Sequence, residues 1–402
     1  MDSFTLNETT VGVVGAGMMG SGIAYACARA GAVVIIVARS REKAEIGKSY
    51  AQEREHRALA RNRGTADTSA ELLRRIVPSS NISELAAADI VIEAVAESVD
   101  IKQQILRDIE RVVASKTIVA STTSTLPITT LAAGLARPGN AIGMHFFSPV
   151  ERMRLLEVVM GEQTESSALD STLRFAERLG KVPIVVRDTR GFFTSRVMDC
   201  YLDEALMAVG EGVRPEMIEK AARNAGYPVS PLQLLDEISL TLNTAVRRET
   251  RVAVEAAALR WTGQRADAVR NRMVDDYRRG GRNSGGGFYD YDSSGSRTGL
   301  WPGLREAFGP TRTIPIEDMS DRLLFIQALE ALQCLDEGVV RSAADADTGS
   351  VLGIGFPAQT GGAINFVERF PGGRTAFVNR ARTLTERYGE RFSPPGTLDE
   401  GI

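Results

Sequence analysis

The stretch VGVVGAGMMGSGIAYACARAG, residues 11–31, decides the fold. A short apolar run leads at once into GAGMMG, which fits the pattern G-x-G-x-x-G, and then into an apolar helical pattern. In such a turn Gly15 permits a tight bend, Gly17 lets the backbone approach a pyrophosphate, and Gly20 lets helix and strand pack closely. Met18 and Met19 would open the helix, whose free N–H groups and positive dipole end favour phosphate. The sequence therefore predicts that these five residues bind a dinucleotide; the alternative is a glycine-rich turn that binds nothing.

Further short apolar runs follow, and helical patterns separate most of them. They are VVIIV at 33–37, ADIVIEAV at 88–95, TIVAST at 117–122, AIGMHF at 141–146, LLEVVMG at 155–161 and KVPIVV at 181–186. Strands that alternate with helices are typical of a parallel, doubly wound sheet. We therefore expect an α/β fold with a Rossmann-type nucleotide-binding domain over residues 1–189.

Beyond Asp188 the pattern is almost entirely helical, and it repeats. Residues of the stretch RVMDCYLDEALMAVGEGV recur 126 positions later in RLLFIQALEALQCLDEGV. The matched positions are Arg196, Glu204, Glu211, Gly212 and Val213 in the first stretch and Arg322, Glu330, Glu337, Gly338 and Val339 in the second. Such a match predicts two copies of one helical unit. We expect a duplicated all-α domain with copies at 190–300 and 301–402, joined by the glycine-rich segment near 280–315.

Composition excludes several classes of protein. The 402 residues carry a formal net charge of −3, and no block of like charge suggests nucleic acid or an anionic membrane as a partner. The N-terminus lacks the features of a signal peptide, and no apolar run is long enough to cross a bilayer. Three scattered cysteines and two histidines make a structural metal site improbable. We expect a multi-domain cytoplasmic protein without a metal.

The second strand pattern bears on the choice of cofactor. An NAD-binding fold usually ends this strand with an acidic residue that accepts the ribose hydroxyls. Here VVIIVARSR places Ala38, Arg39, Ser40 and Arg41 at that point. Arginine forms charge-assisted hydrogen bonds with a 2′-phosphate, and serine adds another. The pattern favours NADP over NAD, although both arginines would also suit a solvated surface beside a helix start.

One of the two histidines is a candidate acid–base. His56 lies in the charged helical stretch EREHRALARNR and is expected to be solvated. His145 ends a strand pattern, at the edge of the sheet where such folds hold reacting groups. An imidazole titrates near neutrality, as proton exchange with a hydroxyl/ketone pair requires. Glu157, in the apolar run LLEVV, is a carboxylate that would need a buried partner such as an imidazole. A satisfied core histidine is the alternative.

Five separated motifs resemble one known family. GAGMMG, IVIEAVAES, STTSTLP, GMHFFSPV with LLEVV, and DTRGFFTSR occur in the order and spacing of the L-3-hydroxyacyl-CoA dehydrogenases. The resemblance covers essentially the whole chain and looks closest to the dehydrogenase part of the multifunctional fatty-acid oxidation α-subunits. Their enoyl-CoA hydratase half is expected to be absent.

The resemblance implies roles for individual residues. His145 would be the catalytic acid–base and Glu157 its orienting partner. Ser124 would bond to the substrate 3-oxygen, and Ser195 would also belong to the catalytic site. Glu97 and Lys102 match family positions that contact the nicotinamide half of the cofactor. Hydride would pass between the nicotinamide and C3.

The sequence also departs from the family pattern. Short members carry Asn where Ser195, Ser148 and Thr122 stand. The family's Gly-rich stretch tends to have Lys-Thr where Asn283 and Ser284 stand. Serine donates one hydrogen bond but lacks the second group of an amide. Because multifunctional α-subunits also show Ser or Thr at the first two of these positions, we interpret these changes as marks of a subgroup.

The sequence and the resemblance thus predict an oxidoreductase that interconverts 3-oxoacyl and (S)-3-hydroxyacyl thioesters, with CoA esters as the expected substrates. NADPH-dependent reduction is the expected direction. Three alternatives remain: an NAD-dependent dehydrogenase of β-oxidation, a non-catalytic nucleotide-binding protein, and a subunit that docks a separate hydratase or thiolase. We expect a monomer or weak dimer, because the second helical copy would occupy the place of a partner subunit.

Overall fold

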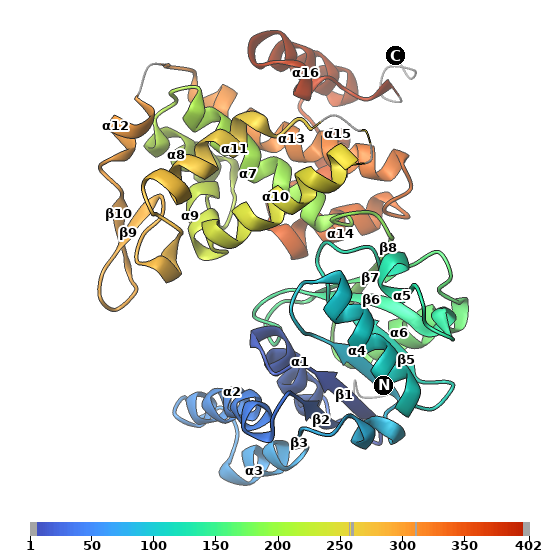
Figure 1. Ribbon diagram of the computed structural model, residues 1–402. Helices are drawn as coiled ribbons and strands as arrows, with labels where there is room; N and C mark the ends of the chain where they lie inside the picture. The colour runs from blue at the N-terminus through green and yellow to red at the C-terminus, as the bar shows by residue number, and fades with distance from the viewer. Residues whose placement is uncertain (1–5, 257, 259–260, 310–311, 397–402) are drawn as a thin grey trace. The chain divides into compact units, whose positions relative to one another are not determined.

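The computed structural model describes residues 6–256, 258, 261–309 and 312–396 (Figure 1). These residues form two compact units. The first contains the chain up to Ser195 together with Glu337–Gly353. The second contains Arg196–Asp336 and the residues from Ile354 onward. The first unit is built on a sheet and the second mainly on helices.

An eight-stranded sheet organises the first unit, in the order β3-β2-β1-β4-β5-β6-β7-β8. Every pair of neighbours is parallel except β6 and β7, which are antiparallel. The predicted doubly wound sheet is therefore confirmed, with β7 and β8 running opposite to the other six strands. Strand β3, IVPS, did not emerge from the sequence, because it is short and contains a proline. The strands are β1 Thr10–Val14, β2 Val33–Val37, β3 Ile76–Ser79, β4 Ile90–Glu93, β5 Ile118–Ser121, β6 Ala141–Phe146, β7 Leu155–Met160 and β8 Val182–Arg187.

Helices pack on both faces of this sheet. Helix α1 is apolar on nearly all sides and is buried, and with α2, α3 and α6 it contributes to one continuous apolar core. Helices α4 and α5 pack against strands β4 to β6. The helices of the first unit are α1 Met18–Arg29, α2 Arg41–Leu59, α3 Ala66–Arg74, α4 Val99–Val112, α5 Ile128–Ala132 and α6 Ser166–Arg178, with 3-10 turns at Ile82–Ala87 and Pro138–Asn140.

A segment from the second predicted helical copy also belongs to the first unit. The Arg187 N–H donates to the Val339 carbonyl, and Val186 forms a bridge with Val340 at the edge of the sheet. Helix α14, Ala343–Ile354, follows this contact. The second copy thus supplies backbone pairing to β8 and one helix to the sheet-containing unit.

The second unit is helical, with one small ribbon. The ribbon pairs β9 with β10 in antiparallel fashion and lies within the segment expected to link the two copies. The elements of the second unit are α7 Thr194–Gly210, α8 Pro215–Ala225, α9 Pro231–Glu237, α10 Leu240–Ala256, α11 Gln264–Asn271, β9 Tyr289–Tyr291, β10 Arg297–Leu300, α12 Leu304–Phe308, α13 Ile316–Asp336, α15 Ala363–Glu368 and α16 Gly373–Tyr388. Helical turns lie at Arg272–Asp276, Arg282–Ser284, Ala358–Thr360 and Glu390–Phe392.

Reciprocal ion pairs join the two helical copies within this unit. Arg322 of α13 contacts Glu204 of α7 at 2.5 Å, and both side chains are completely buried. Arg196 of α7 contacts Glu330 of α13 at 2.6 Å, and both are partly accessible. Because Arg196 and Glu204 are the sequence counterparts of Arg322 and Glu330, each pair is the swapped equivalent of the other. Such reciprocity is the pattern of an isologous interface.

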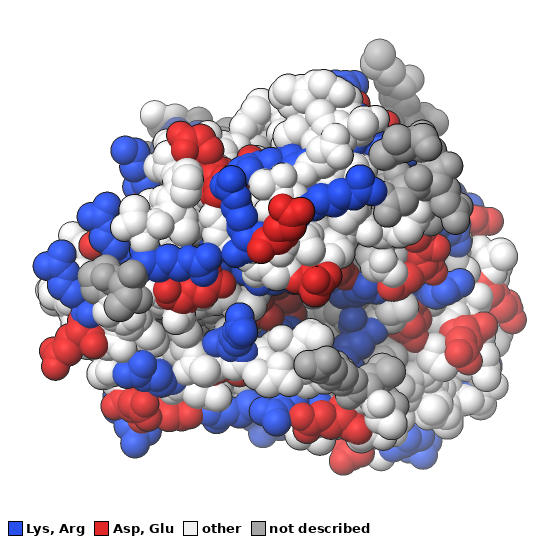
Figure 2. Space-filling view, turned by 90° about the horizontal axis from the view of Figure 1, so that it is seen from above, with Lys and Arg blue, Asp and Glu red and all other residues white. Residues whose placement is uncertain are grey.

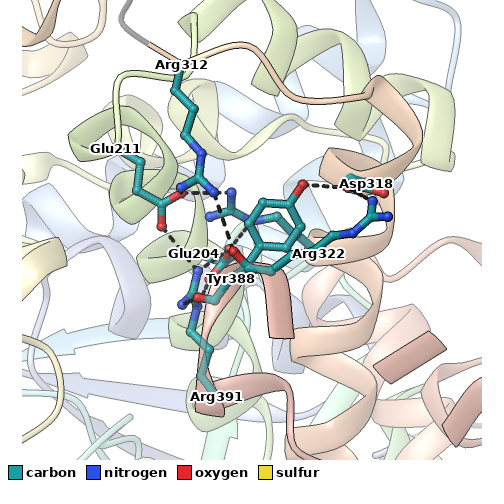
Figure 3. Close-up of polar contacts among 8 residues, drawn as sticks. Glu204, Glu211, Arg312, Asp318, Arg322, Tyr388 and Arg391 are labelled. Carbon is teal, nitrogen blue, oxygen red and sulfur yellow. Dashed lines mark hydrogen bonds and ion pairs between the residues drawn. The ribbon is translucent and has the colours of Figure 1, made fainter. Parts of the chain in front are cut away.

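The buried pair lies inside a larger network, shown in Figure 3. Arg391 also contacts Glu204, and Glu211 accepts hydrogen bonds from Arg322 and Arg312. The Arg322 guanidinium lies 4.6 Å from the centre of the Tyr388 ring. Burial alone would lower the pKa of Arg322, but the two carboxylates outweigh it and raise the pKa.

The surface of the described residues carries mixed charge. On the face shown in Figure 2, Lys and Arg side chains are interspersed with Asp and Glu side chains. No helix among the described residues is long and apolar enough to cross a membrane.

Candidate active site

Many of the predicted site residues follow the carboxyl ends of neighbouring strands. His145 and Glu157 instead lie within β6 and β7, and Lys102 and Ser195 lie within helices α4 and α7. Arg39, Ser40 and Arg41 follow β2, Gly15–Gly20 follows β1, Glu97 follows β4 and Ser124 follows β5. Since adjacent strands lie about 4.8 Å apart, β2 and β6 are separated by roughly 19 Å along this edge. The reversal of strand order between β1 and β4 is the position at which such sheets bind nucleotides.

The glycine turn has the shape that a pyrophosphate requires. Gly15 has a φ of +116°, and a Cβ there would lie 2.4 Å from the Ala94 carbonyl oxygen. A Cβ on Gly20 would lie 1.9 Å from the Gly15 oxygen, whereas one on Gly17 would meet nothing within 4 Å. Helix α1 begins at Met18 without a side-chain cap or an acidic residue in its first turn. The open space beside Gly17 and the uncapped N–H groups fit a bound phosphate group.

The loop after β2 presents positive charge. Arg39 and Arg41 are both exposed. Ser40 is the N-cap of α2, and its hydroxyl oxygen accepts a hydrogen bond from the Lys43 N–H at 3.2 Å. The Arg41 guanidinium makes only a long contact of 3.8 Å with Glu45. No acidic side chain occupies the end of this strand.

A buried charge cluster lies behind the loop after β4. The Lys102 ammonium donates to both carboxylate oxygens of Glu93, at 2.8 and 3.1 Å, and contacts Glu97 at 3.3 Å. Glu93 and Lys102 are almost inaccessible to solvent. Ser121 and the Val95 N–H also donate to Glu93. Lys102 therefore holds Glu97 in place, whereas Glu97 itself remains partly accessible.

Glu97 in turn fixes the loop that carries Ser124. One Glu97 oxygen accepts hydrogen bonds from the Thr123 hydroxyl and from the Ser124 N–H. The Ser124 carbonyl accepts a hydrogen bond from the Ser195 hydroxyl at 3.3 Å. Asp188 holds the far side of this loop, because its two oxygens accept the N–H groups of Ile128 and Thr129, both at 2.6 Å. The structure thus brings Glu97, Lys102, Ser124 and Ser195 together.

His145 and Glu157 form the second group. They lie directly opposite each other in the antiparallel pair β6–β7, which places both side chains on one face. His145 Nδ1 lies 2.6 Å from Glu157 Oε2. His145 is 8% exposed and Glu157 is completely buried. A carboxylate on Nδ1 keeps the proton there, so Nε2 carries the exchangeable site.

The start of helix α7 supports the Glu157 carboxylate. Its Oε1 accepts the N–H groups of Phe193 and Thr194, at 3.2 and 2.9 Å. Phe192, just before them, has a φ of +48°, an uncommon conformation for a bulky residue. Helix α14 packs behind this turn, since a Cβ on Gly353 would lie 3.1 Å from the Thr194 methyl carbon. These backbone groups give the buried negative charge the polar partners it needs.

Sequence reasoning missed four contributors to this arrangement. Glu93, like Glu157, is a carboxylate within an apolar strand, a pattern that indicates a buried partner. That partner is Lys102, nine positions further along the chain. Thr194 and Asp188 lie in the quoted DTRGFFTSR motif without a local pattern that indicates their partners. Gly353 lies in a copy that the sequence placed in the helical domain.

Comparisons with known proteins bear on this geometry. Residues 10–189 match the NAD-binding domain of 3-hydroxyacyl-CoA dehydrogenase, and residues 191–291 match its C-terminal domain. The chain is 36% identical to the (S)-3-hydroxybutyryl-CoA dehydrogenase PaaH1 of Ralstonia eutropha, over 71% of this chain and 99% of that one, with a TM-score of 0.66. The chain belongs to the 3-hydroxyacyl-CoA dehydrogenase family.

Two other structures cover the length of the chain. A 3-hydroxybutyryl-CoA dehydrogenase of Escherichia coli K12 is 26% identical over 98% of both chains, with a TM-score of 0.83. The dehydrogenase part of multifunctional enzyme 1 of C. elegans is 22% identical, over 100% of this chain and 91% of that one, with a TM-score of 0.68, and shows the shared fold. Family membership makes the chain an oxidoreductase with a nicotinamide cofactor.

Proposed function

We propose that this dehydrogenase reduces 3-oxoacyl-CoA esters to (S)-3-hydroxyacyl-CoA esters with NADPH. The observation that carries the chemistry is the buried pair of His145 and Glu157, with Nε2 of the imidazole left for proton exchange. The preference for NADPH is supported by the two exposed arginines after β2, where no carboxylate would repel a 2′-phosphate.

In this proposal the residues of the chain move a proton and hold the reacting ketone. The cofactor, when bound, supplies the hydride that adds to C3. Protonated His145 gives the Nε2 proton to the 3-oxygen, and Glu157 stabilises the imidazolium before this transfer. The Ser124 hydroxyl donates a hydrogen bond to the same oxygen as negative charge develops. Lys102 acts through Glu97, which positions the Ser124 loop. The imidazole then regains a proton from solvent.

The cofactor preference is tested by following the oxidation of NADPH and of NADH in parallel, with acetoacetyl-CoA as the ketone. We expect a higher kcat/KM with NADPH. Arg39→Ala/Arg41→Ala should lower it for NADPH, whereas Ala38→Asp should favour NADH because it restores an acceptor for the ribose hydroxyls. Equal values with both cofactors in the parent would contradict the NADPH proposal and return the enzyme to the NAD-dependent alternative.

CoA as the thioester carrier is supported by an arginine-lined cavity of about 720 Å³ in the first unit. Its lining includes Arg29, Arg54, Arg57, Arg61, Arg63 and Arg152, against two carboxylates, Glu55 and Glu151. Arginine clusters bind phosphate groups by charge-assisted hydrogen bonds. We expect Arg61→Ala to raise KM for acetoacetyl-CoA and to leave the acetoacetyl-pantetheine ester unaffected. Arg111→Ala, on the exposed side of α4, is the matched control. An equal change in KM for both esters would contradict this role.

We also propose that the protein is a monomer. The reciprocal pairs Arg196–Glu330 and Arg322–Glu204 join the two helical copies as a two-fold interface would join two subunits. Light scattering after size exclusion should give one chain per particle across the micromolar range. A stable dimer would contradict the proposal.

A further inference from the structure

The Glu157 carboxylate receives a donor that the proton-transfer proposal leaves without a role. Its Oε2 accepts two hydrogen bonds, one from His145 Nδ1 and one from the Thr194 hydroxyl. Its Oε1 accepts two backbone N–H groups. A carboxylate has about four acceptor positions, so the four contacts saturate it. Thr194 is itself completely buried.

We propose that Thr194 is a positioning residue that sets the proton affinity of His145 by sharing the Glu157 oxygen on which the imidazole depends. This inference rests on the proposed acid–base role of His145. A hydroxyl that donates to Oε2 withdraws negative charge from the oxygen that stabilises the imidazolium. Thr194 therefore makes His145 release its proton to the 3-oxygen more readily than Glu157 alone would allow.

The position of the hydroxyl is fixed from three sides. The Thr194 N–H donates to Glu157 Oε1, so backbone and side chain of one residue hold the two oxygens of one carboxylate. The methyl carbon faces Gly353 of α14, where even a Cβ would approach to 3.1 Å. The preceding turn is held by Gly191 and Phe192, both with positive φ. With the methyl group against α14, the hydroxyl is directed at Glu157.

The surroundings of the pair are mainly apolar among the described residues. Phe147, just after β6, and Phe192, before α7, have ring centres 4.5 and 6.1 Å from that of His145. On β8, Ile184 lies opposite Glu157. The titratable groups on adjoining elements are Asp345 and Asp347 of α14, Asp188 and Arg187 at the end of β8, and Glu97, which holds the Ser124 loop. The described contacts of Glu157 are with His145, Phe193 and Thr194.

Two substitutions separate the hydroxyl from the rest of the side chain. Thr194→Val keeps the methyl packing and removes the donor, whereas Thr194→Ser keeps the donor and removes the methyl. The chain has only two histidines, so labelled imidazoles give two NMR signals, and exposed His56 is an internal control. We expect the titration midpoint of His145 to rise by about 0.5 to 1 pH unit in the Val variant, since one hydrogen bond contributes on that scale. The Ser variant should match the parent, and the His56 signal should not move.

The same variants are then assayed for reduction of acetoacetyl-CoA over pH 5 to 10. The alkaline limb of kcat/KM should move upward with the NMR midpoint in Thr194→Val, and kcat should fall about two- to threefold because the imidazolium is a weaker acid. Coincident His145 midpoints in all three proteins would overturn the inference, as would an equal displacement in the Ser and Val variants. The NMR titration needs no turnover. A displaced midpoint in an enzyme that reduces no 3-oxoacyl ester would therefore refute the proposed function and leave the role of Thr194 in the pair standing.

Discussion

Two buried pairs of a nitrogen base and a carboxylate can be compared within this molecule. His145–Glu157 lies in the sheet-containing unit and Arg322–Glu204 lies in the helical unit, and both carboxylates are completely inaccessible. Their distances are similar, 2.6 and 2.5 Å. They differ in what surrounds the base. The imidazole faces aromatic rings, and the structure gives its Nε2 no partner among the described residues.

Arg322, in contrast, is surrounded by polar groups and covered by an aromatic ring. It shares Glu204 with Arg391, reaches Glu211 as well, and lies over the Tyr388 ring (Figure 3). An arginine cannot lose its proton at any ordinary pH, whereas an imidazole does so near neutrality. The comparison teaches that burial of a charged pair does not by itself indicate catalysis. Arg322 Nη2 is also buried without a hydrogen-bond partner among the described residues, so an unpartnered nitrogen does not separate the two pairs. What separates them is that the imidazole can lose its proton near neutrality and the guanidinium cannot.

The largest effect should come from breaking the first pair at its base. His145→Gln keeps a donor for Glu157 and removes the titratable nitrogen. We expect kcat for acetoacetyl-CoA reduction to fall by about 10²- to 10⁴-fold. The free energy of unfolding in urea should change by no more than about 1 kcal/mol, because one neutral hydrogen bond replaces another. A variant that retains more than a tenth of the parent kcat would refute the catalytic half of the comparison.

Breaking the second pair should lower stability and leave kcat nearly unchanged. Arg322→Met has a similar volume but leaves Glu204 with Arg391 alone and Glu211 with one donor fewer. Removing one partner from a buried ion pair costs about 3 kcal/mol or more. Urea denaturation should show this loss, while kcat measured on the folded protein stays within about twofold of the parent. Arg322→Lys keeps the positive charge but lacks the planar guanidinium, so its free energy of unfolding should lie between those of the parent and Arg322→Met. An unchanged urea midpoint would contradict a structural role.

Asp236 is another buried carboxylate, and its contribution to stability should depend on pH. Burial, opposed by hydrogen bonds from Tyr289, Phe288 and Tyr291, raises the pKa of Asp236 from 3.8 to about 6. A raised pKa means that the folded state holds the proton more tightly, so this residue's contribution to stability falls as the pH rises from about 4 to 6.

Asp236→Asn removes that titration. Its stability relative to the parent should therefore improve by about 2 kcal/mol between pH 4.5 and pH 7.5. Urea denaturation of both proteins at the two pH values measures the difference. A gap between parent and variant that stays constant with pH would contradict the raised pKa.

Much of the first pair could be predicted from the sequence, and the second could not. The strand pattern placed His145 and Glu157 in two adjacent runs, and a carboxylate in an apolar strand indicates a buried partner. Their direct pairing depends on β7 running antiparallel to β6, which alternating strands and helices do not reveal. The repeat predicted that Arg196, Glu204, Arg322 and Glu330 are equivalent in pairs, but not that they cross between copies.

The remaining features depend on contacts between distant segments. Asp188 caps a helix that begins 60 positions earlier, and no local pattern connects the two. Helix α14 packs on the sheet-containing unit although its sequence counterpart, α8, lies in the helical unit. Equivalent sequences therefore have different neighbours, because each copy buries its apolar face against whatever segment lies beside it. Periodicity predicts the helix but not its partner.

The smallest effect should come from the swapped equivalent of the buried pair. Arg196 and Glu330 are 22% and 23% accessible at their side chains, so water screens their attraction. Arg196→Met should lower the free energy of unfolding by no more than about 1 kcal/mol, against about 3 for Arg322→Met. A double-mutant cycle with Glu330→Gln isolates the pair itself. Equal losses for Arg196→Met and Arg322→Met would mean that the two copies share one symmetric interface. Unequal losses would show that the two pairs are equivalent in sequence but not in energy. The Arg322 pair would then contribute more to the free energy of unfolding, because Arg391, Glu211 and Tyr388 surround Arg322.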